Sequence, residues 1–282
     1  MVMMQNYGFK DGGYSLCHVK NCLDMKMDLN GVFHTIGLRR DKLDMIILLF
    51  FFAHWYLSLF FQTFFLHRYT SHKMFKMTPF WEKTFFLLTF IFQGSSFLHP
   101  AAYGVMHRKH HSHADTPEDP HSPVHLTNII SFNLSTVNEY RKLVNEFMSG
   151  ERKSDDVPRW YLLEKIGESV ITRSGFILLY VLFYVEFATE TWQYALLPFH
   201  VFMGSMHGFI VNWFGHKRGY RNFEDTKDNS KNTLPLDLLM MGELYQNNHH
   251  KRPNNMNFAV KWFELDLGYI ATLILKKVKI VH

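Results

Sequence analysis

The sequence predicts an all-α integral membrane protein: a bundle of about three membrane-spanning helices, one interfacial helix, and a cytosolic helical cap that carries clustered histidines. Apolar residues are concentrated in long segments, although the mean hydropathy of the chain is only −0.12. Phenylalanine alone supplies 28 of the 282 residues, and 18 are histidine. We expect residues 1–40 to be a polar extension and residues 41–282 to be one membrane domain.

Three apolar segments are candidates for membrane spans. Residues 43–66 are almost unbroken apolar sequence, and a bilayer core of ~30 Å needs ~20 helical residues. Residues 175–189 and 192–214 are two further apolar segments, and only Glu190 and Thr191 lie between them. The short connection predicts a hairpin that returns the chain to the side from which it started.

A fourth apolar segment is too short to cross. Residues 84–92 would reach roughly 14 Å as a helix, so we expect an interfacial helix that leaves the flanking histidine clusters on one side. Residues 126–170 are mixed and polar, which favours surface helices. Residues 217–245 predict a polar loop followed by an apolar helix, and residues 251–282 predict an amphipathic tail.

Charge indicates the orientation. Lys217, Arg218 and Arg221 flank the hairpin on the histidine side, and its turn has neither Lys nor Arg, so the histidine clusters are expected to be cytoplasmic. The first segment has four basic residues close to each end. A single span there, which we favour, would place the N-terminus outside, whereas a re-entrant hairpin within residues 43–66 would keep it inside. The net charge of +5 suits anionic headgroups or acidic partners. Basic residues form no stripe interleaved with aromatics, which excludes nucleic acid. Cys17 and Cys22 give no disulfide framework.

The histidine clusters read HRYTSH at 67–72, HRKHH at 107–111, NWFGH at 212–216 and QNNHH at 246–250. Side chains three or four residues apart share one face of a helix, so the last three of these clusters can each converge. The first has a five-residue spacing that needs a helix end or bend. The eight candidate ligands are His67, His72, His107, His110, His111, His216, His249 and His250. One tetrahedral metal takes about four ligands, so eight histidines predict two metals.

Neutral imidazoles beside apolar helices at a membrane surface suit oxygen activation next to a lipid chain. Iron is favoured because imidazole binds it and it reduces dioxygen; zinc fits the ligands but has no redox chemistry. A single histidine is more simply interpreted as a surface or core residue that binds no metal. Several histidine clusters in this order favour a metal site instead. We interpret His54 as a helix-packing residue, and Glu186, His200 and His207 as candidates for a tunnel wall.

These motifs resemble the membrane fatty-acid desaturases, in particular the stearoyl-CoA type and its compact bacterial relatives. The resemblance covers about residues 44–270 and is carried by HRYTSH, HRKHHSHADTPEDPHSP, NWFGHKRGY and GELYQNNHH. It implies a non-haem di-iron centre, dioxygen as co-substrate, and a cis double bond in a long acyl chain, often between carbons nine and ten. It also implies that the eight histidines are iron ligands and that Asn212 reaches one iron through water.

One position departs from the family pattern. Gln246 stands where a histidine is usual, and its carbonyl oxygen is a weaker ligand for Fe(II) than imidazole. Front-end desaturases also carry glutamine there and are active, so the change is compatible with activity. His113, His121 and His125 have no ligand counterpart, and the resemblance of Asp119-Pro120-His121 to a family signature suggests an orienting role.

The resemblance also implies partners. No cytochrome b5 signature follows His99-Pro100, so an external donor is expected, either a ferredoxin or cytochrome b5 with its reductase. The acyl chain is carried by coenzyme A or by a membrane lipid. A bacterial inner membrane is favoured, or the endoplasmic reticulum in a eukaryote. The basic residues that could steer an acidic donor, or meet the phosphates of coenzyme A, are Arg68, Lys73, Lys76, Arg108 and Lys109.

Two alternatives stay open. A hydroxylase or alkane monooxygenase could use the same ligands, since rebound after one C–H abstraction gives an alcohol and a second abstraction gives an alkene. A histidine-rich membrane protein that binds or transports divalent metal is the non-enzymatic alternative. A transporter would place its ligands at mid-membrane depth, whereas these clusters lie at helix ends.

Overall fold

The computed structural model describes residues 29–282 apart from residues 127 and 154. Cys17, Cys22 and most of the predicted polar extension lie outside the described residues. The described residues form helices and only isolated β-bridges, which confirms the all-α prediction. Three helical segments are long and apolar enough to span a membrane, namely Asp44–Ser71, Val170–Phe187 and Thr191–Gly215.

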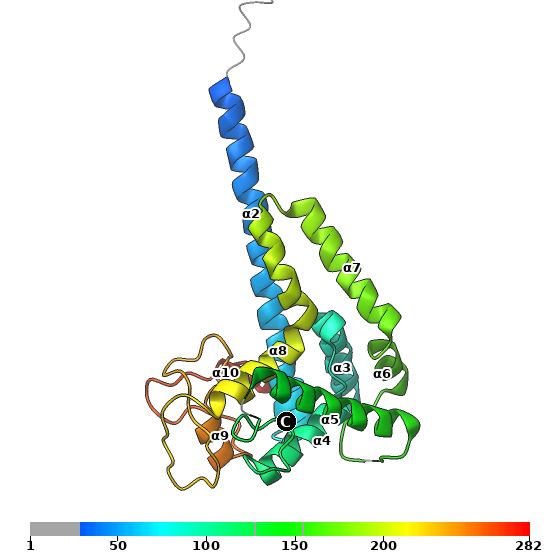
Figure 1. The fold of residues 1–282 in the computed structure, drawn as a ribbon, viewed down its shortest axis with the longest axis vertical. Helices are drawn as coiled ribbons and strands as arrows, with labels where there is room; N and C mark the ends of the chain where they lie inside the picture. The colour runs from blue at the N-terminus through cyan, green and yellow to red at the C-terminus, as the bar shows by residue number, and fades with distance from the viewer. Residues whose placement is uncertain (1–28, 127, 154) are drawn as a thin grey trace, which may run out of the picture.

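The first of these helices is the axis of the molecule. Helix α2 (Leu29–Phe61) runs as a long rod, with α7 (Val170–Phe187) and α8 (Leu197–Gly215) beside it (Figure 1). The short η3 helix (Thr191–Leu196) turns the chain between α7 and α8. Asp44 of α2 accepts a hydrogen bond from Gln193 in that turn at 2.7 Å. The predicted hairpin is therefore present, and a hydrogen bond joins its turn to the first span.

The predicted interfacial helix is longer than expected. Helix α3 (Pro79–Gln93) has 15 residues and meets α4 (Pro100–His113) through the η2 turn (Gly94–Ser96) at an angle of 81°. Proline stands in the first turn of both helices, where its missing N–H costs nothing. Because the chain bends back, the cluster before α3 and the cluster at the end of α4 lie at the same end of the bundle.

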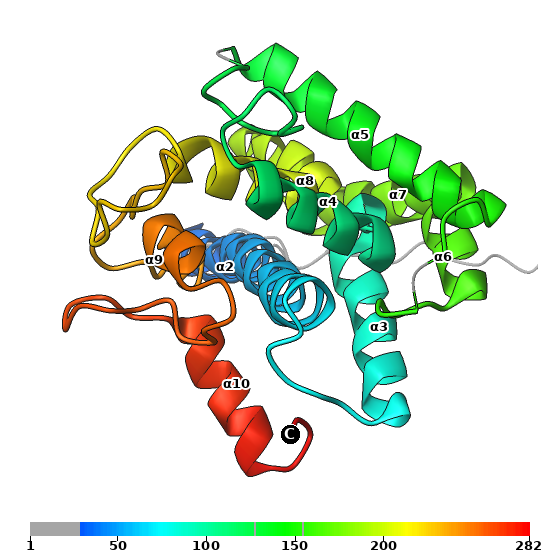
Figure 2. The same ribbon diagram turned by 90° about the horizontal axis from the view of Figure 1, so that it is seen from below.

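The remaining helices form the cap. Figure 2 shows α5 (Ile129–Ser149) lying across α4 and α8, while α6 (Tyr161–Gly167), α9 (Gln246–Lys251) and α10 (Leu267–Lys277) surround the lower end of the spans. These helices bear out the expected helical cap.

One prediction in the cap is wrong: residues 217–245 contain no helix. The apolar stretch before α9 forms turns instead, with left-handed backbone at Met241 (φ 54°) and Gly242 (φ 94°). The Asp237 carboxylate accepts hydrogen bonds from the N–H groups of Met240, Gly242 and Leu244 at 2.8–3.0 Å. A buried aspartate that binds backbone N–H groups in this way competes with helix formation. Burial nevertheless raises the pKa of Asp237 to about 6.

Candidate metal centre

A π-helix brings the first histidine cluster together. The η1 helix (Gln62–Ser71) continues α2 directly, and its hydrogen bonds join residues five apart, as in the 3.2 Å bond from the His72 N–H to the His67 carbonyl. The same winding places the two imidazoles on one face, with ring centroids 4.9 Å apart. The five-residue spacing, which an α-helix would not align, is therefore matched by the local helix type.

The eight predicted histidines converge into two groups. The five-histidine group consists of His67, His72, His107, His111 and His249, and the three-histidine group consists of His110, His216 and His250; within each group one ring nitrogen per residue lies within 4.8 Å of the others. Helices α4 and α9 contribute to both groups. The groups are adjacent, because the ring centroids of His111 and His250 are only 4.4 Å apart.

The ring nitrogens of the five-histidine group point at one another. The Nε2 atom of His107 lies 2.8 Å from that of His72 and 3.0 Å from that of His111. The Nε2 atom of His249 lies 3.0 Å from those of His67 and His111. An imidazole carries only one proton when neutral, so these close contacts cannot all be good hydrogen bonds. A cation at the centre would satisfy them together.

Four of the histidines are oriented by carboxylates that bind their other ring nitrogen. The pairs, measured from Nδ1 to the nearest carboxylate oxygen, are His67–Glu243 at 2.6 Å, His110–Asp119 at 2.8 Å, His216–Asp115 at 2.9 Å and His250–Asp228 at 2.6 Å. Such a partner fixes the proton on Nδ1 and leaves the Nε2 lone pair for a metal. Asp119 was predicted as an orienting residue, but Glu243, Asp115 and Asp228 were not.

The hydrogen bonds of the three-histidine group show whether its ring nitrogens are available to a metal. Asp119 and Asp228 place the protons of His110 and His250 on Nδ1, so both Nε2 atoms carry lone pairs, and these atoms face each other at 3.2 Å. Neither can donate to the other. The Nε2 atom of His216 is also buried and has no hydrogen-bond partner. Buried polar atoms normally have partners, so this donor set fits a bound transition-metal ion.

Burial keeps four of the clustered histidines neutral. Burial lowers the pKa of four histidines well below its ordinary value, and neighbouring imidazoles add to the shift; they are His107, His110, His111 and His249. Neutral imidazole is the form that binds metal. Burial alone would raise the pKa of Asp228, but its bonds to His250 and Ser230 hold that pKa below the ordinary range. The carboxylate therefore stays ionised beside its histidine.

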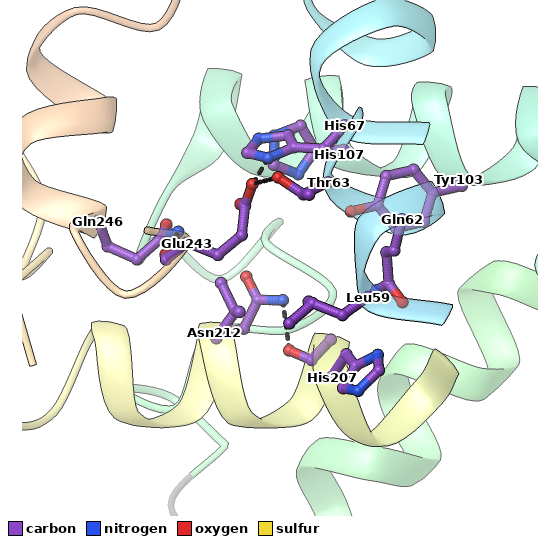
Figure 3. A pocket seen from close by; sticks show the side chains of 12 residues that line it. Leu59, Gln62, Thr63, His67, Tyr103, His107, His207, Asn212, Glu243 and Gln246 are labelled. Carbon is purple, nitrogen blue, oxygen red and sulfur yellow. Dashed lines mark hydrogen bonds and ion pairs between the residues drawn. The ribbon is translucent and has the colours of Figure 1, made fainter. Parts of the chain in front are cut away.

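The two amide side chains of the predicted site lie at a small cavity of about 20 Å³ next to the histidines (Figure 3). Gln246 reaches the cavity from α9 and Asn212 from α8, and His67 and His107 lie at its other side. The amide nitrogen of Gln246 donates to the Glu243 carbonyl at 2.8 Å, and that of Asn212 donates to the Gly208 carbonyl at 2.8 Å. The Gly208 carbonyl belongs to α8 and the Glu243 carbonyl to the turn before α9, so backbone carbonyl groups hold both amide side chains in place.

The three additional histidines of the second cluster behave differently. His113 and His125 are exposed, which agrees with their lack of a ligand counterpart. His121 is buried, its ring lies 4.5 Å from that of His110, and neither of its nitrogens has a partner. With His110 and Asp119 it forms a third set of potential ligand atoms within 4.8 Å.

One of the five residues of the predicted basic docking surface is buried, and three of the others are in ion pairs. Arg68 is fully buried and binds Glu243 at 2.9 Å and Asp266 at 2.8 Å, because it lies on the inner side of the π-helix. It therefore cannot meet a donor protein or a phosphate. Arg108 and Lys73 are paired with Asp156, and Lys109 is paired with Glu139. Lys76 is exposed.

A mostly apolar cavity of about 110 Å³ leads to the histidines. Its wall is formed by α4, α5 and α8, it reaches His107, and none of its lining residues is Lys, Arg, Asp or Glu. Of the tunnel-wall candidates, only His207 lines the cavity system, in the smaller cavity of Figure 3. His200 instead binds His54 at 2.6 Å and Tyr184 at 2.9 Å, and Glu186 is exposed on α7.

The geometry can now be set beside known proteins. The sequence model of the family described as fatty acid desaturase matches residues 45–271. The chain belongs to the fatty acid desaturase family. The matched residues contain all eight clustered histidines and, apart from Asp44, the three segments long enough to span a membrane.

Curated relatives give the same family. A delta-9 desaturase-like 5 protein of Arabidopsis thaliana is 27% identical over 73% of this chain and 66% of its own length. An sn-1 stearoyl-lipid 9-desaturase of Anabaena variabilis is 27% identical over 74% of this chain and 73% of its own length. A hex-5-enoyl-(acyl-carrier protein) acetylenase of Moorena producens is 27% identical over 80% of this chain and 73% of its own length. The family is therefore shown, and relatives within it differ in the reaction they are named for.

Proposed function

We propose that this protein is an oxygen-dependent fatty acyl desaturase that introduces a cis double bond into a long acyl chain. The observation that carries the proposal is the apolar cavity that ends at His107, within a cluster of eight inward-facing histidines. Two irons held by the two groups would supply the oxidant needed to remove two hydrogens from an unactivated carbon chain.

The residues around the cavity suit an extended hydrocarbon. Gly208 on α8 leaves room along its wall, because a Cβ atom there would meet only the Gln62 amide at 3.8 Å, and Phe132 and Thr136 of α5 also line the cavity. The absence of charged side chains from its lining favours a chain held by apolar contact. Such walls exclude water and hold one carbon–carbon bond of the acyl chain near the histidines. The depth to which the chain enters the cavity then decides which bond reacts.

The finer assignments follow from the relatives and from charge. Two relatives are named for position nine, one of them for a stearoyl chain on a lipid, which favours a double bond between carbons nine and ten here. Acyl-CoA and acyl-lipid both remain candidate substrates. We propose that the histidine side is cytoplasmic, because Lys217 and Arg218 flank it, and that a ferredoxin or cytochrome b5 with its reductase supplies two electrons per turnover.

The test is a fatty-acid profile from an aerated host that expresses the chain, with double-bond positions determined. The controls are an empty-vector culture and a His110→Ala culture. A new monoene that requires the intact histidine supports the proposal and fixes the bond position. An alcohol would favour the hydroxylase, and an alkyne would favour an activity like that of the acetylenase; either product in place of an alkene would refute desaturation.

A further inference from the structure

Helix α10 turns its apolar side chains outward. Ile270, Leu273 and Ile274 share one face of the helix through their spacing, and all three are exposed. The buried residues of α10 are instead Gly268 and Thr272. A helix on the surface of a water-soluble protein places its apolar stripe toward the core. Because α10 has the reverse arrangement, its outer face is suited to an apolar environment.

Both ends of α10 are attached to apolar helices of the bundle. At its start, the Asp266 carboxylate caps α10 and binds Arg68 of η1 at 2.8 Å. A Cβ atom at Gly268 would lie 2.5 Å from the Arg68 guanidinium, so α10 packs directly on η1. Beyond its end, Val281 forms a β-bridge with Met77, two residues before α3 begins. Helix α10 therefore joins the end of the first span to the start of α3.

The orientation of α10 agrees with a position at the membrane surface. Figure 2 shows α2 end-on, whereas it shows α10 along its length. Helix α10 thus lies across the spans, in the direction of a bilayer surface. Trp262 comes shortly before α10 and is 94% exposed. Tryptophan is enriched at membrane–water interfaces, because its ring is apolar and its N–H is polar.

Charge distinguishes the end of α10 from its apolar face. Residues 267–282 contain neither aspartate nor glutamate. They contain three exposed lysines, which we call the lysine cluster: Lys276, Lys277 and Lys279. A lysine side chain can lie along an apolar surface while its ammonium group reaches the polar layer. Basic residues beside a membrane are attracted to anionic lipids, so this end of α10 complements phosphate groups that carry a net negative charge.

We propose that α10 lies in the headgroup layer of the bilayer and binds anionic phospholipid. Its apolar face contacts the first carbons of the acyl chains, and the lysine cluster binds the phosphate groups. The second half of α5 provides a contrast within the cap, because its exposed residues there include Arg141, Lys142 and Asn145, as expected for a helix in water. This inference does not depend on the reaction that the protein catalyses.

The first experiment measures the depth of α10 in lipid nanodiscs that hold one molecule each. Ile274→Cys is labelled with a fluorophore in a chain in which Cys17 and Cys22 are replaced by serine. We expect phospholipids with a nitroxide on the acyl chain to quench the label, and iodide in the water to have little effect. Asn145→Cys, on the exposed polar face of α5, is the matched control and should show the reverse. Both positions are exposed, so neither label disturbs the core.

The second experiment tests the class of lipid. The nitroxide is placed on phosphatidylglycerol or on phosphatidylcholine, at equal amounts in nanodiscs of the same composition. We expect phosphatidylglycerol to be enriched beside the label at residue 274 by at least ~5-fold, the effect of roughly one basic residue near an anionic surface. Changing the whole lysine cluster to glutamine should remove this preference. The matched change of three basic residues elsewhere on the cap should retain it; these are Arg141, Lys142 and Lys153.

Three results would overturn the proposal. Quenching of the label at residue 274 by iodide, to the extent seen at residue 145, would show that α10 faces water. Protection from both quenchers only when two molecules share a nanodisc would assign the face to a second copy of the chain. Equal quenching by the two lipids, or a preference that survives loss of the lysine cluster, would refute the binding of anionic lipid. Desaturation would be unaffected by any of these outcomes.

Discussion

The two histidine groups differ in the number of imidazoles and in the number of carboxylates that bind them. The group with more imidazoles has fewer such carboxylates. The five-histidine group has one carboxylate-bound member, His67, whereas every member of the three-histidine group has its own aspartate. The supports also differ in origin. Glu243 belongs to a buried network with Arg68 and Asp266, while Asp115 and Asp228 come from loops. Each imidazole of the three-histidine group is thus held in orientation by a carboxylate. The five-histidine group has more imidazoles, but only one of them is held in this way.

The largest expected effect is loss of product when either group loses a ligand. His107→Ala and His216→Ala should each abolish double-bond formation, since both metals are needed for the reaction. His216→Ala and His107→Ala should each lower the iron content by one equivalent, because each removes a histidine of a different group. Fatty-acid profiles and iron content measure both effects. His113→Ala, which changes an exposed histidine of the second cluster, is the control and should retain product and both irons.

The next effect concerns the network under the five-histidine group. Arg68→Met leaves Glu243 and Asp266 buried without a cation, and breaking a buried pair in this way costs about 3–5 kcal/mol. Thermal unfolding in detergent should show the loss. Arg152→Met removes the arginine of a partly exposed pair with Glu146, which should cost about 1 kcal/mol or less. Equal losses from the two variants would mean that the network does not support this group.

A smaller effect separates the two kinds of support. Glu243→Gln should weaken iron only at the five-histidine group, and Asp228→Asn only at the three-histidine group, each by ~10- to 100-fold. Anaerobic titration with Fe(II) measures the two affinities. If either variant weakened both positions equally, the groups would act as one unit and the comparison above would fail.

The smallest effect is expected at Lys109, which lies between His107 and His110 on α4. Its ammonium pairs with Glu139 at 2.7 Å on the surface. Lys109→Met should change the unfolding free energy by about 0.2–1 kcal/mol and leave both irons in place. Glu139→Gln is the matched change in the partner. Iron loss in either variant would show that the surface pair influences the ligands.

The sequence predicted the membrane spans and the convergence of the eight histidines well, because both depend on local patterns. Hydrophobic segment length identified the hairpin, and helical spacing identified which imidazoles share a face. The division into five and three was not predictable, since His110 and His111 are adjacent in sequence yet join different groups. That division depends on the rotation of α4, which directs His107 and His111 to one group and His110 to the other.

The misses share a physical cause. Asp228 lies 22 residues before His250 in an irregular loop, and no spacing rule connects a loop carboxylate to a distant imidazole. Arg68 sits within a basic surface pattern, but the π-helix turns it inward onto Glu243 and Asp266. The predicted helix before α9 failed because Asp237 binds three backbone N–H groups there. In each case a tertiary contact overrode the local pattern.

The π-helix has a consequence for how the protein responds to its surroundings. Helix α2 and η1 form one uninterrupted rod from Leu29 to Ser71, and the first histidine cluster is at the end of that rod. A hydrophobic span longer than the bilayer core is accommodated in part by tilting. Because the helix continues through η1 without a break, we expect such a tilt to move His67 together with α2.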